Sequence, residues 1–492
     1  RVAAAPLAIA AVAVAVLLLI LGGAGAGAKG TMVSARQVGR PIPPGFVGLS
    51  IEPKSLEQYA GTDAAAIDPV FVALLRAIAP GQSSVLRIGG DGTDWSWWPV
   101  PGVAQPGGVK YSLTPRWMAV ARALTGAVAG RLILGVDLEA DSIRVAAAEA
   151  HAMVSRIGAG SIDALELGNE PELYGTFGWY RSASGRQVPG RPRGYSVADF
   201  THDFTEFAPH LAGAPLAGPA SGAPAWLAQL GSFLRAEPRV KLATIHAYPL
   251  KHCVRSTVVT KAQLLADSSS HGLAQRLAGY LQVARANRDE LRIDELNGVS
   301  CGGTRGVSDT FASALWVLDT LFELARVGFS GVNVHSVPGT INELLGPSRS
   351  GGSWHMRVHP EFYGMMMFAQ AAPPGSRLLS VRSAVPAGVK LWATRGPGDA
   401  IHVVAINKRL SRPVRLSLRI AGARGPASVM RLLAPSVGAT SGVTLGGQSF
   451  GAQTSTGLLS GPASAETVTS SDDVYRIRVA PASAAMLTLA GS

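Results

Sequence analysis

The chain has 492 residues, more than one ordinary hydrophobic core accommodates, and this predicts two domains. Its composition is 47% hydrophobic and 15% charged, with 58 glycines and 32 prolines, which excludes a disordered chain and predicts a loop-rich globular protein. The formal net charge is +12, but no zinc-finger spacing, phosphate-binding loop or dense basic run indicates nucleic-acid binding. The excess charge fits an acidic polysaccharide or an anionic cell surface, or an arginine-rich genome composition alone.

Residues 1–28 are expected to lie outside the fold. No charged residue occurs from Val2 to Ala28, the stretch Val12–Leu21 is strongly apolar, and small residues precede Lys29. This pattern is typical of a secretory signal peptide, and it is also long enough for an uncleaved membrane anchor. Both alternatives predict an extracytoplasmic protein, either secreted or held at a membrane by this segment alone.

Between residues 46 and 360, short apolar segments alternate with helical patterns. This alternation predicts an α/β fold of the (β/α)8 TIM-barrel type. Strands are expected at 46–52, 84–90, 131–138, from 164 to the Asn-Glu-Pro sequence at 169–171, and at 217–221, 241–248, 291–295 and 331–336. Helices are expected at 69–78, 115–128, 141–157, 197–210, 273–285 and 310–327.

The pattern changes after residue 360, where one more helix at 362–371 precedes segments with the sequence pattern of β-strands. Alternating or short apolar segments separated by Gly, Pro and Ser predict a C-terminal antiparallel β-sandwich over 361–492. Its expected strands are 389–394, 401–407, 414–418 and 474–479, with 437–471 as an exposed connection. Residues 29–45 include a short segment, 32–35, that is expected to be a strand pairing elsewhere in the chain.

Two acidic residues lie at the ends of different barrel strands. Pro171 ends the fourth strand because it has no N–H for a ladder, which leaves Asn169 and Glu170 at the strand tip. Glu295 ends the seventh strand. In a parallel barrel these tips carry the catalytic groups, and glycosidic bond cleavage needs two carboxylates. The alternative is that Asn-Glu-Pro is only a turn and Glu295 a surface acid.

The two carboxylates suggest distinct roles. Glu170 is expected to be the general acid/base and Glu295 the nucleophile, with Asn169 holding the substrate 2-hydroxyl. The two carboxyl groups lie about 5–5.5 Å apart in a retaining enzyme and roughly 6.5–9.5 Å apart in an inverting one. This chemistry requires neither a metal nor an organic cofactor.

Other polar residues end or follow neighbouring strands and are expected to line the same pocket. Tyr248 is expected to donate to Glu295, with core packing as the alternative, and Arg87 to lower a carboxylate pKa, with an ion pair to Glu166 as its alternative. Clustered tryptophans after the second strand suit stacking on sugars. The further pocket candidates are Asp91, His246, Asn333 and His335, and the aromatic ones Trp95, Trp97, Trp98, Trp179, Tyr180 and Trp354, with Asp94 beside them.

Several of these segments carry a family resemblance. The stretches 46–52, 86–90, 165–174 and 295–297 resemble the retaining glycosidases of clan A, and most closely glycoside hydrolase family 79, the β-glucuronidase and heparanase group. The resemblance covers roughly residues 31–492. It implies Glu170 as acid/base, Asn169 as the 2-hydroxyl contact and Glu295 as nucleophile. It also implies that the strand near Met32 joins the C-terminal sandwich, so that the barrel is inserted into the β domain.

We expect a β-linked glucuronide as substrate, cut from the chain end by a monomeric enzyme. One departure concerns the uronic carboxylate, which tyrosines after strands seven and eight help to bind in that family, because no tyrosine occurs between Tyr280 and Tyr363. A β-glycosidase for another sugar and a non-catalytic carbohydrate-binding protein therefore remain alternatives. The replacement candidates are the loop residues Gly298 and Ser300 and the cations Arg305, His335 and Arg357.

The two cysteines follow neighbouring strands. Cys253 comes after the sixth strand and Cys301 after the seventh, so their loops should lie close together. Export would permit a disulfide between them. We expect a Cys253–Cys301 bond, with two buried thiols as the alternative.

Overall fold

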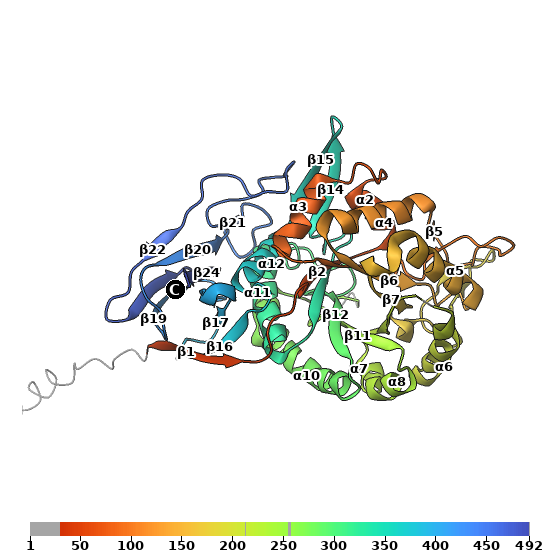
Figure 1. Cartoon of the computed structure of the whole chain (residues 1–492), viewed down its shortest axis with the longest axis horizontal. Coiled ribbons are helices and arrows are strands. Elements are labelled where there is room, and N and C mark those ends of the chain that lie inside the picture. Colours follow the sequence, from red (N-terminus) through yellow and green to blue (C-terminus); the bar gives the residue numbers. More distant parts are fainter. Residues whose placement is uncertain (1–29, 212, 254–256, 492) are drawn as a thin grey trace, which may run out of the picture.

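The computed structural model describes residues 30–211, 213–253 and 257–491. The segment 1–28, expected to be a signal peptide or anchor, lies outside the described residues. Figure 1 shows two units side by side, a barrel ringed by helices and a smaller β domain. In the part of the chain that is described, no helix has both the length and the apolar character needed to span a membrane.

Eight parallel strands close into a barrel, which confirms the predicted TIM-barrel fold. Nearly every strand residue is buried, as expected when a parallel sheet is covered on both faces. Each predicted strand segment overlaps one of these strands. They are β2 (Val47–Ile51), β3 (Val85–Ile88), β6 (Arg131–Val136), β7 (Ile162–Leu167), β10 (Leu216–Ser221), β11 (Val240–Ala247), β12 (Glu290–Leu296) and β13 (Gly331–His335).

Helices surround the barrel, and local capping sets where several of them begin. The Asp68 side chain accepts from the Val70 N–H just before Pro69, and Thr114 caps the Trp117 N–H just before Pro115. The helices are α2 (Leu56–Ala60), α3 (Pro69–Ile78), α4 (Pro115–Val128), α5 (Ile143–Met153), α6 (Val197–Phe207), α7 (Pro224–Leu227), α8 (Leu230–Ala236), α9 (Lys261–Leu265), α10 (His271–Ala286), α11 (Phe311–Val327) and α12 (Pro360–Ala371). The last of these packs against α11 and α3, so the ring of barrel helices runs to Ala371.

The β domain is one curled, mostly antiparallel sheet whose inner face encloses a second core, which includes Val33, Leu418, Tyr475 and Leu487. This agrees with the predicted sandwich domain. Its strands are β1 (Thr31–Val38), β16 (Arg377–Arg382), β17 (Val389–Arg395), β18 (Ile401–Asn407), β19 (Val414–Ile420), β20 (Ala427–Leu433), β21 (Thr444–Leu445), β22 (Glu466–Val468), β23 (Val474–Val479) and β24 (Ser483–Leu489). The N-terminal strand β1 lies between β16, to which it is antiparallel, and β19, to which it is parallel.

Three two-stranded ribbons decorate the loops of the barrel. One of them, after the eighth strand, projects beyond α3 at the top of Figure 1. The ribbons are β4 (Ser96–Trp97) with β5 (Tyr111–Ser112), β8 (Tyr180–Arg181) with β9 (Gln187–Val188), and β14 (Leu345–Ser350) with β15 (Ser353–Val358).

The segment 437–471 is largely exposed, as its Ser- and Gly-rich composition predicts, but parts of it pack on the barrel. Phe450 is buried and packs on Tyr363 of α12, and the carbonyls of Val437 and Ala439 accept the first N–H groups of α11. Bonds from a distant segment thus satisfy helix donors that have no partner inside the helix. The connection therefore fastens the β domain to the barrel.

A buried ion pair also joins the two domains. Asp319 of α11 accepts from Lys408 Nζ at 2.6 Å, from Ser270 Oγ at 2.6 Å and from Trp392 Nε1 at 2.9 Å. The Trp392 ring stacks on Phe322 with 5.4 Å between ring centroids. Polar and apolar contacts therefore fix the β domain against α11.

Candidate active site

The Asn169–Glu170 turn lies at the C-terminal end of β7. Glu170 has a φ of 45°, a left-handed conformation that costs a non-glycine residue roughly 1–2 kcal/mol and occurs at functional sites. The Asn169 N–H donates to Asp94 Oδ2 at 3.1 Å and to the Tyr174 hydroxyl at 3.0 Å, while the Glu170 N–H donates to the Ala220 carbonyl at 2.9 Å. These bonds hold both side chains at the barrel mouth.

Arg87, at the end of β3, links the centre of the site and is fully buried. Its Nε lies 2.7 Å from Glu166 Oε2 and 2.9 Å from Asp294 Oδ2. Its Nη1 lies 2.7 Å from Glu295 Oε2, and its Nη2 donates to Asn169 Oδ1 at 2.8 Å. One guanidinium therefore orients both catalytic candidates, Glu295 directly and Glu170 through its neighbour Asn169. The expected alternative, an ion pair with Glu166, is present as well.

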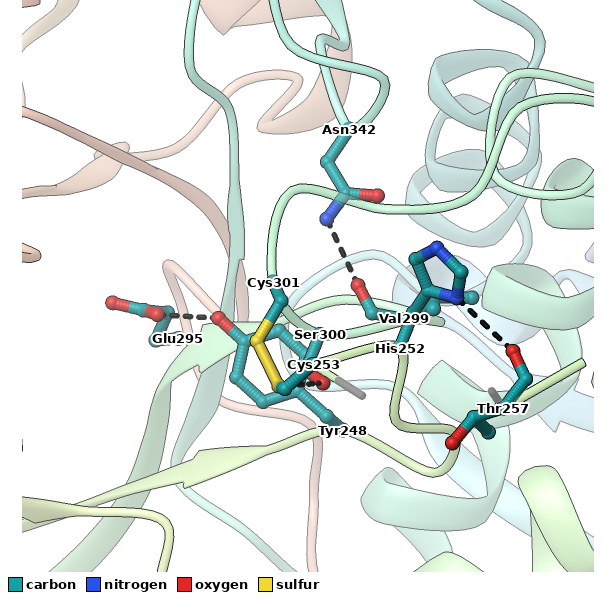
Figure 2. Close-up of a disulfide and its surroundings, with 9 residues drawn as sticks. All are labelled: Tyr248, His252, Cys253, Thr257, Glu295, Val299, Ser300, Cys301 and Asn342. Atoms are coloured by element: carbon teal, nitrogen blue, oxygen red, sulfur yellow. Dashed lines mark hydrogen bonds between the residues drawn. A yellow bond between two sulfur atoms is a disulfide. The ribbon is translucent and has the colours of Figure 1, made fainter. Parts of the chain in front are cut away.

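Glu295, at the end of β12, is held in its ionised form. The Tyr248 hydroxyl donates to Glu295 Oε1, as Figure 2 shows, and Arg87 donates to the other oxygen. Burial alone would raise the pKa of Glu295, but the positive charges of His246, His335 and Arg87 and the Tyr248 hydrogen bond hold that pKa well below its usual range. A buried, ionised and fixed carboxylate is suited to act as a nucleophile.

Glu170 lies opposite Glu295 and retains access to solvent, with 23% of its side chain exposed. Its Oε1 lies 3.0 Å from His246 Nδ1, which lies 3.9 Å from Glu295 Oε1. One carboxylate oxygen from each glutamate and one ring nitrogen of His246 all lie within 4.8 Å of one another. The two carboxylates are therefore close enough to act on one glycosidic bond.

His246 lies between the two glutamates and above Asp294. Burial lowers its pKa, but Glu295, Asp294 and Glu170 outweigh burial and raise that pKa well above its usual value. On the other side of Arg87, burial and the neighbouring Asp294 raise the pKa of Glu166 to about 8, against the opposing charge of Arg87. Both shifts favour proton uptake and so ease the crowding of negative charge around Arg87.

Glu170, His246 and Glu295 are also the group of potential metal ligands that the described residues bring together. Arg87 donates to one oxygen of Glu295 and Tyr248 to the other, and the fixed positive charge of Arg87 beside this group opposes the binding of a second cation.

A second group of polar residues lines the other side of the mouth, after strands β2, β3 and β13. Glu52 accepts from the Gly92 N–H at 2.6 Å, and its other oxygen lies 3.5 Å from His335 Nε2. Asp91 lies on the same side of the mouth, where part of its surface is exposed. Desolvation by neighbouring protein atoms, followed by the charges of Glu52, Glu295 and Glu170, raises its pKa to about 7. Sequence reasoning did not include Glu52 among the site residues, although its position directly after a barrel strand was the available signal.

Three expected site residues lie apart from this group. Asn333 is fully buried below it and bonds to Arg292 and to the carbonyls of Leu49 and Val85. A Cβ on Gly298 would meet Leu264 at 2.8 Å, so that residue faces packed side chains. The Ser300 N–H donates to the Leu250 carbonyl, and its hydroxyl lies 3.3 Å from Cys253 Sγ.

The charged and aromatic candidates in the loops mostly have structural partners. Arg357 pairs with Glu343, whereas Arg305 is exposed. Trp97 and Trp179 are buried together, and the indole N–H of Trp179 donates to the Asp94 carbonyl. The remaining rings are partly exposed, and cations lie over three of them: Lys110 over Trp95, Arg156 over Trp98 and Arg349 over Trp354.

The predicted disulfide is present between Cys253 and Cys301. It joins the loops after β11 and β12, and a β-bridge between Leu250 and Val299 joins them as well. The first loop begins with Tyr248, directly after β11, and the second follows β12, which carries Glu295. Figure 2 draws both residues with the disulfide.

The β domain matches a known family. Residues 392–486 match the sequence model of the glycosyl hydrolase family 79 C-terminal beta domain. The C-terminal domain thus resembles the family 79 β domain. This match confirms the resemblance to family 79. It lies in the C-terminal domain, whereas the motifs that first indicated the family lie in the barrel. A search of curated proteins found no match to the chain.

Solved structures share the fold of both the barrel and the β domain. A 4-O-α-L-rhamnosyl-β-D-glucuronidase from Fusarium oxysporum has a TM-score of 0.73 at 18% identity, covering 93% of this chain and 100% of its own. A family 51 arabinofuranosidase from Xanthomonas axonopodis has a TM-score of 0.64 at 13% identity, with 93% and 99% covered. A bifunctional glucanase-xylanase from a metagenome library has a TM-score of 0.63 at 13% identity, with 94% and 99% covered. The family 79 domain and this shared fold support a glycoside hydrolase.

Proposed function

We propose that the protein is an exported retaining β-glycosidase in which Glu295 is the nucleophile and Glu170 the acid/base. The observation that carries this proposal is the pair of carboxylates on β7 and β12, whose facing oxygens lie within 4.8 Å. The Cys253–Cys301 bond supports the exported location, because disulfides persist in oxidising compartments.

The reaction proceeds in two displacements. Glu295 attacks the anomeric carbon while Glu170 gives its proton to the leaving glycosidic oxygen, which forms a covalent glycosyl-enzyme and frees the aglycone. Glu170 then takes a proton from water, whose oxygen attacks the anomeric carbon and releases Glu295. Two inversions at this carbon leave the anomeric configuration of the sugar retained.

Asn169 positions the sugar in this scheme. Arg87 donates to its Oδ1, which fixes the orientation of the amide, and no hydrogen bond within the described residues uses its Nδ2. The amide N–H is therefore available to the 2-hydroxyl, a contact that strengthens in the transition state.

The first substrate to test is a β-glucuronide. The family 79 domain supports this choice, as does the shared fold of a structure described as a rhamnosyl-glucuronidase. One observation favours a neutral sugar as the second candidate. Glu52 and Asp91 line the mouth beside Glu170 and Glu295, while Arg87, His246 and His335 each already face a carboxylate. An anionic sugar would enter a site with no unpaired cation among these groups.

A panel of aryl β-glycosides separates the candidates, using protein that lacks residues 1–28. Release from the glucuronide alone assigns the uronic acid specificity. Release only from the glucoside or galactoside keeps the mechanism and changes the sugar. Silence on all three, followed by binding of an oligosaccharide without turnover, assigns a non-catalytic carbohydrate-binding protein and overturns the proposal.

The nucleophile is tested by Glu295→Ala. We expect turnover to fall by several orders of magnitude, because no covalent intermediate can form, and azide to restore part of it by entering the vacated space. Proton NMR should show that the rescued product is a glycosyl azide of inverted configuration. The control is Glu206→Ala, which removes an exposed acid on α6. Undiminished activity in Glu295→Ala would exclude the assignment.

A further inference from the structure

A cavity of about 420 Å³ opens at the N-terminal end of the barrel, away from the catalytic strand tips. The segment 40–46, which connects β1 to β2, forms one wall, and the C-terminal ends of α10 and α11 form the others. Figure 1 shows this connection running from the β domain to the barrel beside α10 and α11. The cavity belongs to neither the catalytic group nor the disulfide.

Three arginines line this cavity without an acidic partner. Arg40, Arg285 and Arg288 form no ion pair within the described residues, although Asp289 and Glu290 lie in the same wall. Within the described residues, Arg285 Nη2 donates to the Gly328 carbonyl at 2.8 Å. Burial and then the charge of Arg40 lower the pKa of Arg285.

The acids of this wall do not neutralise the arginines. Burial raises the pKa of Asp289, and the cation that opposes this shift is Lys241, which lies outside the cavity. Lys241 and Arg235 line an adjoining cavity of about 320 Å³ that shares Arg288 and Asp289. Five cations and two carboxylates therefore surround two adjoining cavities.

We propose that the cavity lined by Arg40, Arg285 and Arg288, hereafter the basic cleft, binds an oxyanion of the phosphate or sulfate class through these three arginines. Unpaired like charges beside a cavity repel one another, and a bound anion would remove that repulsion. The planar guanidinium fork matches the oxygen spacing of a tetrahedral anion and is less strongly hydrated than an ammonium. The apolar wall residues Ile42 and Phe46 limit competing water on one side.

Two sources could supply this chemistry, a free ion or the phosphate of an anionic lipid headgroup. Calorimetric titration with sodium phosphate and sodium sulfate, against sodium chloride at matched ionic strength, tests the free ion. Cosedimentation with phosphatidylcholine vesicles that either contain or lack phosphatidylglycerol tests the lipid.

The deciding variant is Arg40→Gln/Arg288→Gln, which removes two exposed cations of the cleft. Its matched control, Arg36→Gln/Arg415→Gln, removes two exposed arginines of the β domain and changes the net charge equally. We expect saturable binding to the wild type and the control, weakened about tenfold or more in the cleft variant, which corresponds to about 1.4 kcal/mol. Far-UV circular dichroism checks that both variants fold.

The outcomes separate cleanly. Binding of free phosphate or sulfate that is lost in the cleft variant assigns a free-ion site. Binding only to phosphatidylglycerol vesicles, lost in the same variant, assigns a headgroup site. No saturable binding in either arm, or equal weakening in the cleft variant and its control, overturns the proposal.

Discussion

Tyr248 contacts the proposed nucleophile, Glu295, through its hydroxyl group. Its phenol is buried against Glu295, and the same carboxylate receives Arg87 on its other oxygen. The aromatic residue at the end of the sixth strand was predictable from the sequence, and so were Arg87 and both glutamates. Their types and their strand-end positions suffice to bring them together, because the tips of barrel strands converge.

Tyr248→Phe tests this contact. A hydrogen bond to a charged group contributes about 1.5–3 kcal/mol, so we expect kcat/KM to fall roughly 10- to 100-fold. Because the Tyr248 bond helps to lower the pKa of Glu295, its loss raises that pKa, and the acidic limb of the pH–rate profile should move to higher pH. The control is Tyr280→Phe on α10, away from the site. An unmoved acidic limb would contradict this role.

The remaining residue-scale features were not predictable. His246 was expected to bind substrate, but its charged state depends on three carboxylates from two other strands. Glu52 gains its place from a loop N–H at Gly92 and from His335 on the neighbouring strand β13. Such pairings depend on loop geometry, which hydrophobic periodicity does not encode.

At the scale of elements, the loops after β11 and β12 are held together by the Cys253–Cys301 bond. The bond closes a segment of 48 residues in sequence separation. The double variant Cys253→Ser/Cys301→Ser should lose up to about 4 kcal/mol of unfolding free energy, chiefly because the unfolded chain gains freedom. Urea denaturation measures this loss.

A matched control for the disulfide is Ser300→Ala, which removes the hydroxyl beside Cys253 and leaves the bond intact. We expect that variant to lose no more than about 1 kcal/mol. A double cysteine variant as stable as the wild type would show that the β-bridge between Leu250 and Val299 alone holds the loops.

Elements were predictable where local signals agree. Pro and a capping side chain mark the starts of α3 and α4, and apolar runs mark all eight barrel strands. Strands β16, β20 and β24 were missed because their Leu-, Ala-, Met- and Ser-rich sequences lack β-branched alternation. β24 is a strand because β18 and β20 pair with it on both sides.

At the scale of the whole molecule, the junction between barrel and β domain depends on a buried charge. Lys408→Met would leave Asp319 without its cation, and such a loss costs about 3–5 kcal/mol. Burial raises the pKa of Asp319, but Lys408 and Lys390 bring it below its usual 3.8. The stability from this pair is therefore present above pH 3.8 and lost as the pH falls through the lower, folded value.

Scanning calorimetry at neutral pH measures the effect of Lys408→Met. We expect a lower transition temperature, or separate transitions for the barrel and the β domain. Lys54→Met is the control, because Lys54 is exposed and has no ion pair in the described part of the chain. A loss below about 1 kcal/mol would class the pair with surface salt bridges.

The place of β1 has a consequence for biosynthesis. This strand leaves the ribosome before the barrel, yet its two partners, β16 and β19, are made only after the barrel. At roughly 5–20 residues per second, β1 waits on the order of tens of seconds for them. The barrel can close in that interval, whereas the β domain completes its sheet only after β24 has been made. An export pathway that carries unfolded chains would remove this delay, because both ends of the sheet would become available together.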